Sequence, residues 1–373
     1  MKKRVLIVFG TRPEAIKMAP LVYEFKKYNN TFDTKICVTA QHRQMLDQVL
    51  DFFNINPDYD LNLMKDNQTL SDITVNVLKG MDGVISDFKP DLIFVQGDTT
   101  TTFVTALAGF YSKTRVAHLE AGLRSFSKYS PFPEEINRIL AGHLSDFHFT
   151  PTMNAYNNLI NEGIKNNVYN VGNTVIDALF LGIEIIKKQG NEKFINFFKN
   201  IDFKKRIILV TGHRRESFGE PFQNICLAIK NIAESYNDVE IIYPVHLNPN
   251  VQKPVYSILK GINNIHLIEP LDYPYLIWLM DKSYLVLTDS GGIQEEAPSL
   301  SKPVLVMREV TERIEGVEAG TAKLVGTDPS KIINETQILL DDKNEYLRMS
   351  KAVNPYGDGK TSQRILKILI DKF

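Results

Sequence analysis

The sequence is poor in cysteine, and this scarcity limits the kinds of site that it can build. Its 373 residues include two cysteines, Cys37 and Cys226, which lie far apart in the apolar stretches KICVTA and NICLAI. Cysteines in such positions are typical of buried thiols in a reducing compartment. We therefore exclude a disulfide framework, and we expect no metal site.

The chain also lacks an excess of charge of either sign. Lys and Arg number 43 and Asp and Glu number 44, so there is no general positive field that would attract nucleic acid or an anionic membrane. We expect neither as a partner. Any anionic ligand must be met by a few local groups.

Long apolar runs are missing as well. No stretch approaches the roughly 20 residues that a membrane span requires. Residues 1–9 have a basic start and a short apolar run, but no cleavage site of small residues follows, so we interpret them as a strand rather than a signal peptide. These features predict a soluble, cytoplasmic protein.

The length favours two domains, because single cores stop growing near about 250–300 residues. Short β-branched runs alternate with helical periodicity, which is the pattern of parallel α/β sheets. We expect domains at 1–170 and 171–354, with the final helix, within 355–373, packing back on the first. The expected strands are VLIVFG (5–10), KICVTA (35–40), DLIFVQGD (91–98), VAHLEA (116–121) and FHFTPT (147–152), and then RIILVTG, VEIIYPVH, IHLIEP, YLVLTDS, PVLVM and AKLVG between 206 and 326.

Ligands of open α/β sheets bind beyond the carboxyl ends of the strands, so the residues after each strand are the candidates for function. Arg12 and Lys17 follow the first expected strand and lie near a helix N-terminus, which favours an anion. Lys17 as a solvated helix charge and Arg12 as a plain loop residue are the alternatives.

Three acids follow later strands of the first half. Asp98 and Glu120 come at strand ends and should face the same crevice, although Asp98 is also a plausible N-cap for the helix that begins in the threonine run. Glu134 stands beside Glu135 at a helix start, where capping and the helix dipole are sufficient reasons for an acid.

In the second half, His213 follows the strand RIILVTG and stands beside two arginines, which favours function over a purely structural role. His246 has the same position after its own strand, but the residues beside it favour a functional role less. Ser290, Gly291 and Gly292 form a strand-to-helix turn whose backbone N–H groups can approach a pyrophosphate closely.

A tight turn alone also explains two glycines. Glu296, about one turn into the following helix, is placed to accept both ribose hydroxyls, and Arg313 adds a cation. No Gly-Lys-Ser/Thr follows the turn and no Gly-x-Gly-x-x-Gly is present, so neither a Walker loop nor a dinucleotide fingerprint is indicated.

Seven motifs spread over nearly the whole chain carry all of these residues except Arg313: GTRPEAIKMAP (10–20), QGDTTTT (96–102), HLEAGLRS (118–125), PFPEEINR (131–138), GHRRESFG (212–219), PVHLNPNV (244–251) and TDSGGIQEEAPSLSKPVLVMR (288–308). Together they resemble the non-hydrolysing UDP-N-acetylglucosamine 2-epimerases. The resemblance implies two Rossmann-like domains with parallel sheets facing a central cleft, as in B-type glycosyltransferases. It also implies a homodimer that interconverts UDP-GlcNAc and UDP-ManNAc for surface polysaccharide synthesis without a nicotinamide cofactor or metal.

The resemblance also implies roles for individual residues. The catalytic group would be Asp98, Glu120, Glu134 and His213. Substrate and UDP would be bound by Arg12, Lys17, Asp98, Glu120, His213, Ser290, Gly291, Gly292, Glu296 and Arg313.

Two further sets of positions follow from the resemblance. Leu271 and Leu276 stand where related sequences can have Gln and Phe, so they would contact the nucleotide through backbone only. Gln41, His42 and Gln44 match a stretch that binds an activating second UDP-GlcNAc in some bacterial members, but Asn67 replaces an arginine used there.

Several activities remain compatible with the residues. They include a hydrolysing epimerase that releases ManNAc, an epimerase of a related UDP-2-acetamido sugar, a glycosyltransferase and a UDP-sugar sensor without activity.

Overall fold

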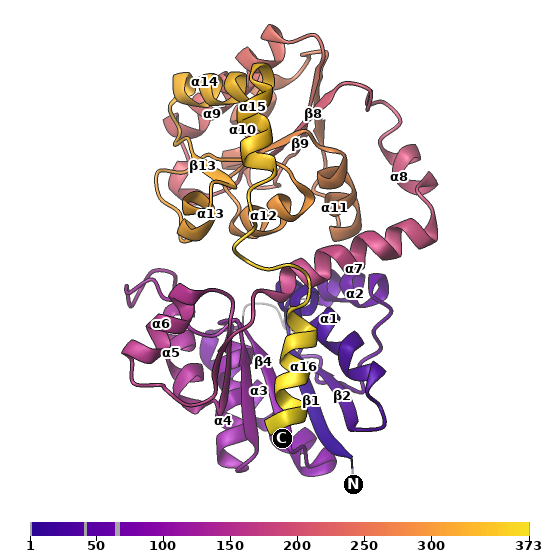
Figure 1. Cartoon of the computed structure of the whole chain (residues 1–373), viewed down its shortest axis with the longest axis vertical. Helices are drawn as coiled ribbons and strands as arrows, with labels where there is room; N and C mark the ends of the chain where they lie inside the picture. Colours follow the sequence, from indigo (N-terminus) through magenta and orange to yellow (C-terminus); the bar gives the residue numbers. More distant parts are fainter. Residues whose placement is uncertain (1, 41–42, 64–67, 373) are drawn as a thin grey trace. The chain divides into compact units, whose positions relative to one another are not determined.

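The protein is described by a computed structural model over residues 2–40, 43–63 and 68–372. The chain forms two compact units (Figure 1), Met1–Leu181 with Tyr356–Phe373 (unit 1) and Gly182–Pro355 (unit 2). The division after Leu181 lies beyond the expected boundary at 170, because helix α7 (Thr174–Gln189) begins in unit 1 and runs without a break into unit 2.

Unit 1 contains a parallel sheet in the order β3-β2-β1-β4-β5-β6-β7. All five strands expected in this half are present. Two short strands, β3 and β7, come in addition, and neither contains an apolar run like those of the five. The strands are β1 (Lys3–Phe9), β2 (Phe32–Val38), β3 (Tyr59–Asp60), β4 (Leu92–Gln96), β5 (Arg115–Leu119), β6 (Phe147–Thr150) and β7 (Val168–Asn170).

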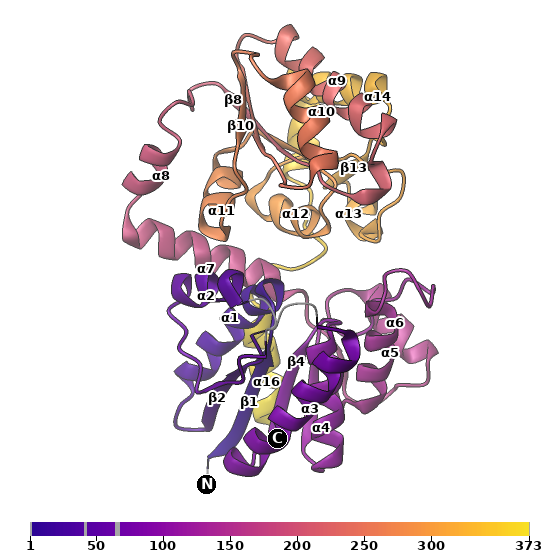
Figure 2. The same cartoon turned by 180° about the vertical axis from the view of Figure 1, so that it is seen from behind.

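Helices cover both faces of this sheet. The final helix α16 packs beside α1, and the two views in Figures 1 and 2 place α16 and α3 on opposite faces of the sheet. The helices of unit 1 besides α7 are α1 (Arg12–Lys27), α2 (Arg43–Phe52), α3 (Leu70–Phe88), α4 (Thr100–Tyr111), α5 (Glu134–Leu144), α6 (Met153–Asn161) and α16 (Thr361–Lys372).

Unit 2 contains a second parallel sheet, in the order β10-β9-β8-β11-β12-β13. Its strands match the six that the sequence predicts. They are β8 (Arg206–Thr211), β9 (Val239–Pro244), β10 (Ile265–Ile268), β11 (Leu285–Thr288), β12 (Val304–Val306) and β13 (Ala322–Leu324).

The helices of unit 2 connect these strands. They are α8 (Glu192–Phe197), α9 (Glu220–Ser235), α10 (Pro249–Leu259), α11 (Tyr273–Lys282), α12 (Gly291–Glu296), α13 (Ile314–Glu318), α14 (Pro329–Asp341) and α15 (Lys343–Ser350), with the short 3-10 turns η1 (Arg215–Ser217) and η2 (Ala297–Leu300).

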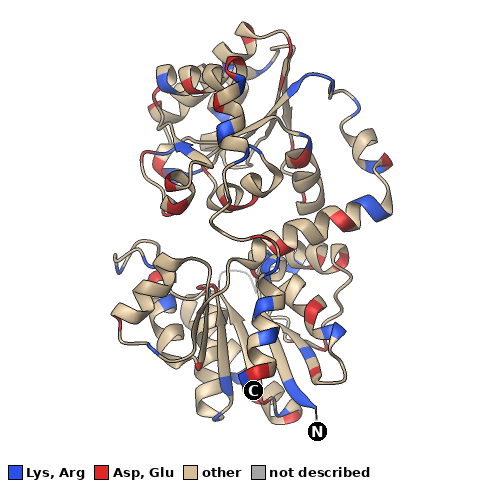
Figure 3. Ribbon diagram, viewed as in Figure 1, with Lys and Arg blue, Asp and Glu red and all other residues tan. Residues whose placement is uncertain are grey.

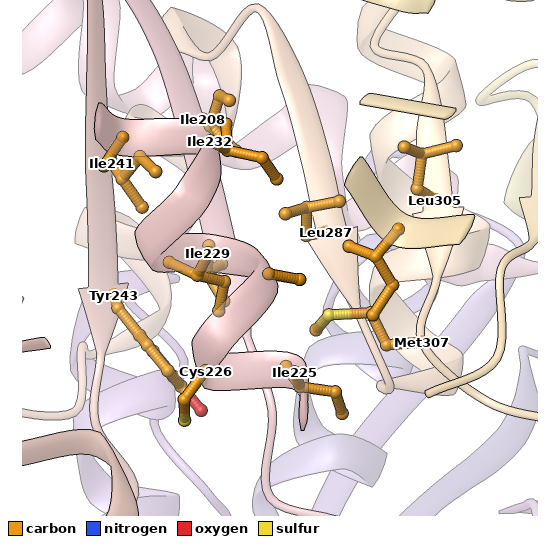
Figure 4. Packing of buried hydrophobic residues seen from close by; sticks show 14 of the residues in the cluster. Ile208, Ile225, Cys226, Ile229, Ile232, Ile241, Tyr243, Leu287, Leu305 and Met307 are labelled. Carbon is orange, nitrogen blue, oxygen red and sulfur yellow. The ribbon is translucent and has the colours of Figure 1, made fainter. Parts of the chain in front are cut away.

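The core of unit 2 forms where α9 lies on the sheet. Figure 4 shows Ile225 and Ile229 of α9 among side chains from strands β8, β9 and β11. Cys226 belongs to the same buried cluster, and burial raises the pKa of its thiol to about 12. This packing agrees with the buried, unpaired thiol that the sequence predicts.

Charged residues of both signs are interspersed along the helices of each unit (Figure 3). Across residues 2–40, 43–63 and 68–372, no helix combines the length and the apolarity needed to cross a bilayer.

Candidate functional site

The carboxyl ends of three neighbouring strands bring the candidates of unit 1 to one edge of its sheet. Strand β4 pairs in parallel with β1 on one side and with β5 on the other. Arg12 follows β1, Asp98 follows β4 and Glu120 follows β5. Parallel strands end at the same edge, so these three residues share it.

Glu120 is the most enclosed of these acids. Only 7% of the residue is exposed, and Lys17 Nζ donates to its Oε1 at 2.7 Å and to its Oε2 at 2.5 Å. Gln96 also donates to Oε2, and Asn173 Nδ2 lies 3.4 Å from Oε1. The carboxylate is therefore held from a strand, β4, from a helix, α1, and from the loop between β7 and α7.

Lys17 is not a solvated helix charge, so that alternative is wrong. Its side chain is only 16% exposed and forms an ion pair with Glu120. Glu120 Oε2 also lies 3.7 Å from the point where a Cβ on Gly97 would stand, which places the pair next to the turn that carries Asp98.

Asp98 is bonded to an arginine that sequence reasoning did not single out. Arg138 on α5 donates from Nε to Asp98 Oδ2 at 2.9 Å, and Asn137 Nδ2 donates to the Asp98 carbonyl at 2.9 Å. The N-cap of α4 is Thr99, whose side chain accepts from the Thr102 N–H. The interpretation of Asp98 as that cap is therefore wrong.

The two acids at the start of α5 have different surroundings. Glu135 accepts the backbone N–H groups of Ser125 and Phe126 at 2.9 and 3.0 Å. Burial alone would raise the pKa of Glu135, but these bonds and Arg138 lower it. Glu134 Oε2 is buried and has no hydrogen-bond partner among the residues that the structure describes, so capping does not account for this acid.

The start of α1 is organised around a buried acid. Glu14 Oε2 accepts the N–H groups of Gly10 and Thr11 at 3.0 and 2.7 Å, and Thr99 donates to Oε1 at 2.6 Å. Burial raises the pKa of Glu14 in spite of these bonds. The turn after β1, which leads into Arg12 at the start of α1, is thereby tied to the turn after β4.

His118 supports the same edge from within β5. It is fully buried and its Nε2 lies 2.7 Å from the Gly97 carbonyl oxygen. Burial lowers the pKa of His118 to about 4, so the neutral ring donates to Gly97 at neutral pH and supports the turn before Asp98.

Only part of the expected activator-binding stretch lies among the residues that the structure describes. Gln44 lies on α2 and is exposed. Gln41, His42 and Asn67 lie outside the described residues.

In unit 2, a buried aspartate organises the loop after β8. Asp289 is 1% exposed, and its Oδ2 accepts the backbone N–H groups of His213 and Arg214 at 2.6 and 2.7 Å. Because Asp289 follows β11, the neighbour of β8, the two loops are joined at the carboxyl edge of this sheet.

The His213 ring stacks on the His246 ring. The two rings are stacked with centroids 5.1 Å apart, and His213 Nδ1 lies 3.6 Å from Asp289 Oδ1. Burial lowers the pKa of His213, Asp289 opposes this shift, and His246 and Arg214 add to it. The ring is therefore neutral at pH 7 and can donate one N–H.

The Ser-Gly-Gly turn begins helix α12, with Ser290 as its N-cap. A Cβ on Gly291 would lie 3.0 Å from Arg313 Cζ, whereas a Cβ on Gly292 would meet only Glu296 Oε2, at 3.9 Å. Arg313 Nε donates to Glu295 at 2.9 Å. The guanidinium of Arg313 thus rests directly on the glycine turn.

Glu296 lies close to this turn and is bonded to α11, the helix near which the two leucines lie. Glu296 is 6% exposed and its Oε1 accepts from the Tyr273 hydroxyl at 3.0 Å. Leu271 is buried just before α11, and Leu276 lies within the first two turns of α11.

Arg308 joins two loops of unit 2. Its guanidinium donates to Glu216 Oε1 at 2.6 Å and to Glu312 Oε2 at 3.0 Å. Burial alone would raise the pKa of Glu312, but Arg308 lowers it to about 2. Glu312 directly precedes Arg313, so this link connects the loop after β8 with the residue that covers Gly291.

Sequence reasoning missed Asp289, Arg138 and Arg308 as candidates, although all three belong to the quoted motifs. Asp289 directly precedes the Ser-Gly-Gly turn, and this position at a strand end was a usable signal. Nothing in the sequence showed that Arg138 pairs with Asp98 or Arg308 with Glu216, because these acids lie 40 and 92 residues away.

Among the residues that the structure describes, no three His, Cys, Asp or Glu side chains are grouped so that they could hold a metal ion.

Both units are Rossmann-like, and two such parallel-sheet units in one chain define a B-type glycosyltransferase-like fold. The family model of UDP-N-acetylglucosamine 2-epimerase matches residues 25–370. The chain belongs to this family.

Individual relatives agree with this assignment. A UDP-N-acetylglucosamine 2-epimerase from Campylobacter jejuni is 57% identical over 376 residues, which covers 99% of this chain and 98% of that protein. The Escherichia coli K12 enzyme of the same name is 54% identical and covers 98% of both chains. The crystal structure of UDP-GlcNAc 2-epimerase from Neisseria meningitidis bound to UDP-GlcNAc has a TM-score of 0.90 at 50% identity, covering 99% of this chain and 100% of that chain.

Proposed function

We propose that this protein catalyses the reversible conversion of UDP-N-acetylglucosamine into UDP-N-acetylmannosamine without hydrolysis. The observation that carries the proposal is the likeness, at 50% identity over 99% of the chain, to an epimerase whose crystal structure contains UDP-GlcNAc. The edges of the two sheets supply chemical groups that fit such a substrate.

The reaction faces one chemical obstacle, because the hydrogen at C2 of the sugar is not adjacent to a carbonyl. Elimination provides a route. A base removes the C2 proton while the C1–O bond to UDP breaks and its electron pair leaves with UDP, which gives 2-acetamidoglucal and UDP. A proton then returns to the opposite face of C2, and the UDP oxygen adds again at C1.

We assign the proton transfers to unit 1. Two opposite faces of C2 require at least two acid/base groups. Asp98, Glu120 and Glu134 are the candidates, and the first two share the carboxyl edge of the sheet. Arg12 and Lys17 complete the proposed substrate contacts of this unit.

We assign the leaving group to unit 2. UDP gains negative charge as the C1–O bond breaks, and donors that are already in place stabilise that charge most effectively. The Ser290-Gly291-Gly292 turn with Arg313 resting on it supplies amides and a cation, and His213 supplies a neutral N–H donor. Glu296 accepts the ribose hydroxyls.

Retaining the glucal is what separates an epimerase from a hydrolase. Water that reaches the intermediate or the sugar would release free ManNAc and UDP. A hydrolysing epimerase, and an epimerase of a related UDP-2-acetamido sugar, are therefore the alternatives that a test must separate.

Proton NMR of the protein with UDP-GlcNAc in deuterium oxide tests the proposal. UDP-ManNAc with deuterium at C2, and deuterium entering the remaining UDP-GlcNAc, are the expected products. Free ManNAc would show hydrolysis, and unchanged UDP-GlcNAc would rule out both forms of epimerisation of this sugar. A panel of UDP-2-acetamido sugars run in parallel identifies the preferred substrate.

We further propose that the protein acts in the cytoplasm, as a homodimer, and that its product feeds surface polysaccharide synthesis. Sedimentation equilibrium of the purified protein tests the homodimer.

A further inference from the structure

A buried tyrosine–carboxylate pair lies beside the Ser-Gly-Gly turn of unit 2. Tyr273 is 4% exposed and Glu296 is 6% exposed, and the Tyr273 hydroxyl donates to Glu296 Oε1 at 3.0 Å. A phenol donates one hydrogen bond, and a bond to a charged carboxylate in a buried site is stronger than one in water. This bond therefore restricts the rotation of the Glu296 carboxylate.

The second oxygen of the carboxylate points toward the turn. Glu296 Oε2 is the atom that lies 3.9 Å from where a Cβ on Gly292 would stand, and among the described residues no atom outside the adjoining backbone and neighbouring residues of Gly292 lies closer to that point. Tyr273 thus holds one oxygen while the other faces the glycine turn where the nucleotide is proposed to bind.

Tyr273 lies on a helix that is held in place by stacked aromatic rings. It begins α11, and on the same helix Trp278 stacks on Phe198 with centroids 5.3 Å apart and on Phe194 with centroids 5.7 Å apart. The Trp278 indole N–H donates to Asn191 Oδ1 at 3.2 Å. The helix that presents the tyrosine is thereby anchored at a distance from the carboxylate.

We propose that Tyr273 is a positioning residue for nucleotide recognition, which orients Glu296 so that its carboxylate accepts both hydroxyls of a ribose diol. The inference rests on the proposed binding of UDP in unit 2. Two hydroxyls on neighbouring carbons require a carboxylate in one defined orientation, and a freely rotating carboxylate would lose part of this selectivity.

Calorimetric titration with two nucleotides tests the proposal. UDP carries the diol, and 2′,3′-dideoxy-UDP lacks it. We expect Tyr273→Phe to weaken UDP binding about fivefold, the effect of losing one net hydrogen bond of about 1 kcal/mol, and to change dideoxy-UDP binding less than about twofold. Each titration is run well below the thermal midpoint of the variant, so that the affinity measured is that of the folded protein.

Two further variants complete the test. Glu296→Gln should remove most of the preference for UDP over dideoxy-UDP, and Tyr273→Phe should add no further loss to it, because both act through one carboxylate. Tyr236→Phe is the matched control: Tyr236 donates to a different carboxylate of the same unit, Asp341 Oδ2, at 2.7 Å. It should leave both affinities unchanged.

Each other result overturns the inference. Equal weakening of both nucleotides by Tyr273→Phe would show a merely structural role, and unchanged UDP affinity would show that the bond orients nothing. If the wild-type protein bound both nucleotides equally, the ribose diol would not contribute to recognition at all. The epimerase proposal is tested separately by the NMR products. If it fails there, the nucleotide titrations can still be interpreted, because they measure binding and not turnover.

Discussion

Lys17 and Glu120 form a partly buried ion pair between α1 and the end of β5, with both carboxylate oxygens within 2.7 Å of the lysine nitrogen. The two residues are 103 positions apart in the sequence. The pair is a functional contact in our proposal, and it is also a structural one whose removal has a predictable cost.

Replacing Lys17 with Met should destabilise unit 1 by about 3 kcal/mol, because it leaves a buried carboxylate without its cation. The double variant Lys17→Met, Glu120→Gln should be less destabilised than the sum of the single variants. Thermal and urea unfolding measure this. Additive effects would mean that the two groups do not interact.

Replacing Asp98 with Asn should abolish epimerisation while leaving UDP affinity within about twofold of the wild type. The change keeps the shape of the side chain but removes its proton-transfer capacity, which contributes about 10²–10⁴-fold to a rate. Turnover is followed by NMR and UDP binding by calorimetry. Loss of binding with retained turnover per bound substrate would contradict a catalytic role.

His118 should make unit 1 sensitive to acid. Its pKa is lowered by burial to about 4 from 6.5, so between these values the unfolded chain binds a proton that the folded chain does not. Stability is therefore full above pH 6.5 and falls toward pH 4, by about 3 kcal/mol for a shift of this size.

The variant His118→Gln isolates this contribution, because an amide can still donate to the Gly97 carbonyl but does not titrate. Its unfolding free energy should depend less steeply on pH between 6.5 and 4 than that of the wild type. His148, whose pKa burial also lowers, remains in both proteins, but its charge acts on His118, so the difference between the two curves reports His118 together with its repulsion by His148. Parallel pH curves for the two proteins would refute the assignment.

Replacing Gly291 with Ala should weaken UDP binding about tenfold or more with little loss of stability. The new methyl group would stand 3.0 Å from Arg313 Cζ, and the flexible guanidinium would move away from the turn. Gly83→Ala is the control, since among the described residues nothing outside the adjoining helix backbone lies within 4 Å of its added Cβ. Calorimetry and thermal unfolding separate the two effects.

Replacing Arg308 with Lys should lower both the stability of unit 2, by about 2 kcal/mol, and the affinity for UDP. Lysine keeps the charge but cannot bond two carboxylates in the geometry of a guanidinium, so the loop that carries Arg313 loses its tether. Arg348→Lys is the matched control, because Arg348 pairs with Glu345 on an exposed surface. A control change above about 0.5 kcal/mol would undermine the comparison.

Much of the fold was predictable because it depends on local patterns. All eleven expected strands occur where β-branched runs predict them, and the two short strands β3 and β7 lack such a run. The domain boundary was harder to predict, since α7 has the same helical periodicity on both sides of Leu181.

The sequence by itself determined the two α/β units, the family, and the rule that reactive residues follow strand ends, because periodicity and motif spacing are properties of neighbouring residues. Tertiary structure alone decided the pairings. Arg138 with Asp98, Asp289 with the His213 amide, and Tyr273 with Glu296 each join residues at least 23 positions apart. Such contacts arise only when parallel strands bring distant turns to one edge, and no local pattern encodes which side chains then meet.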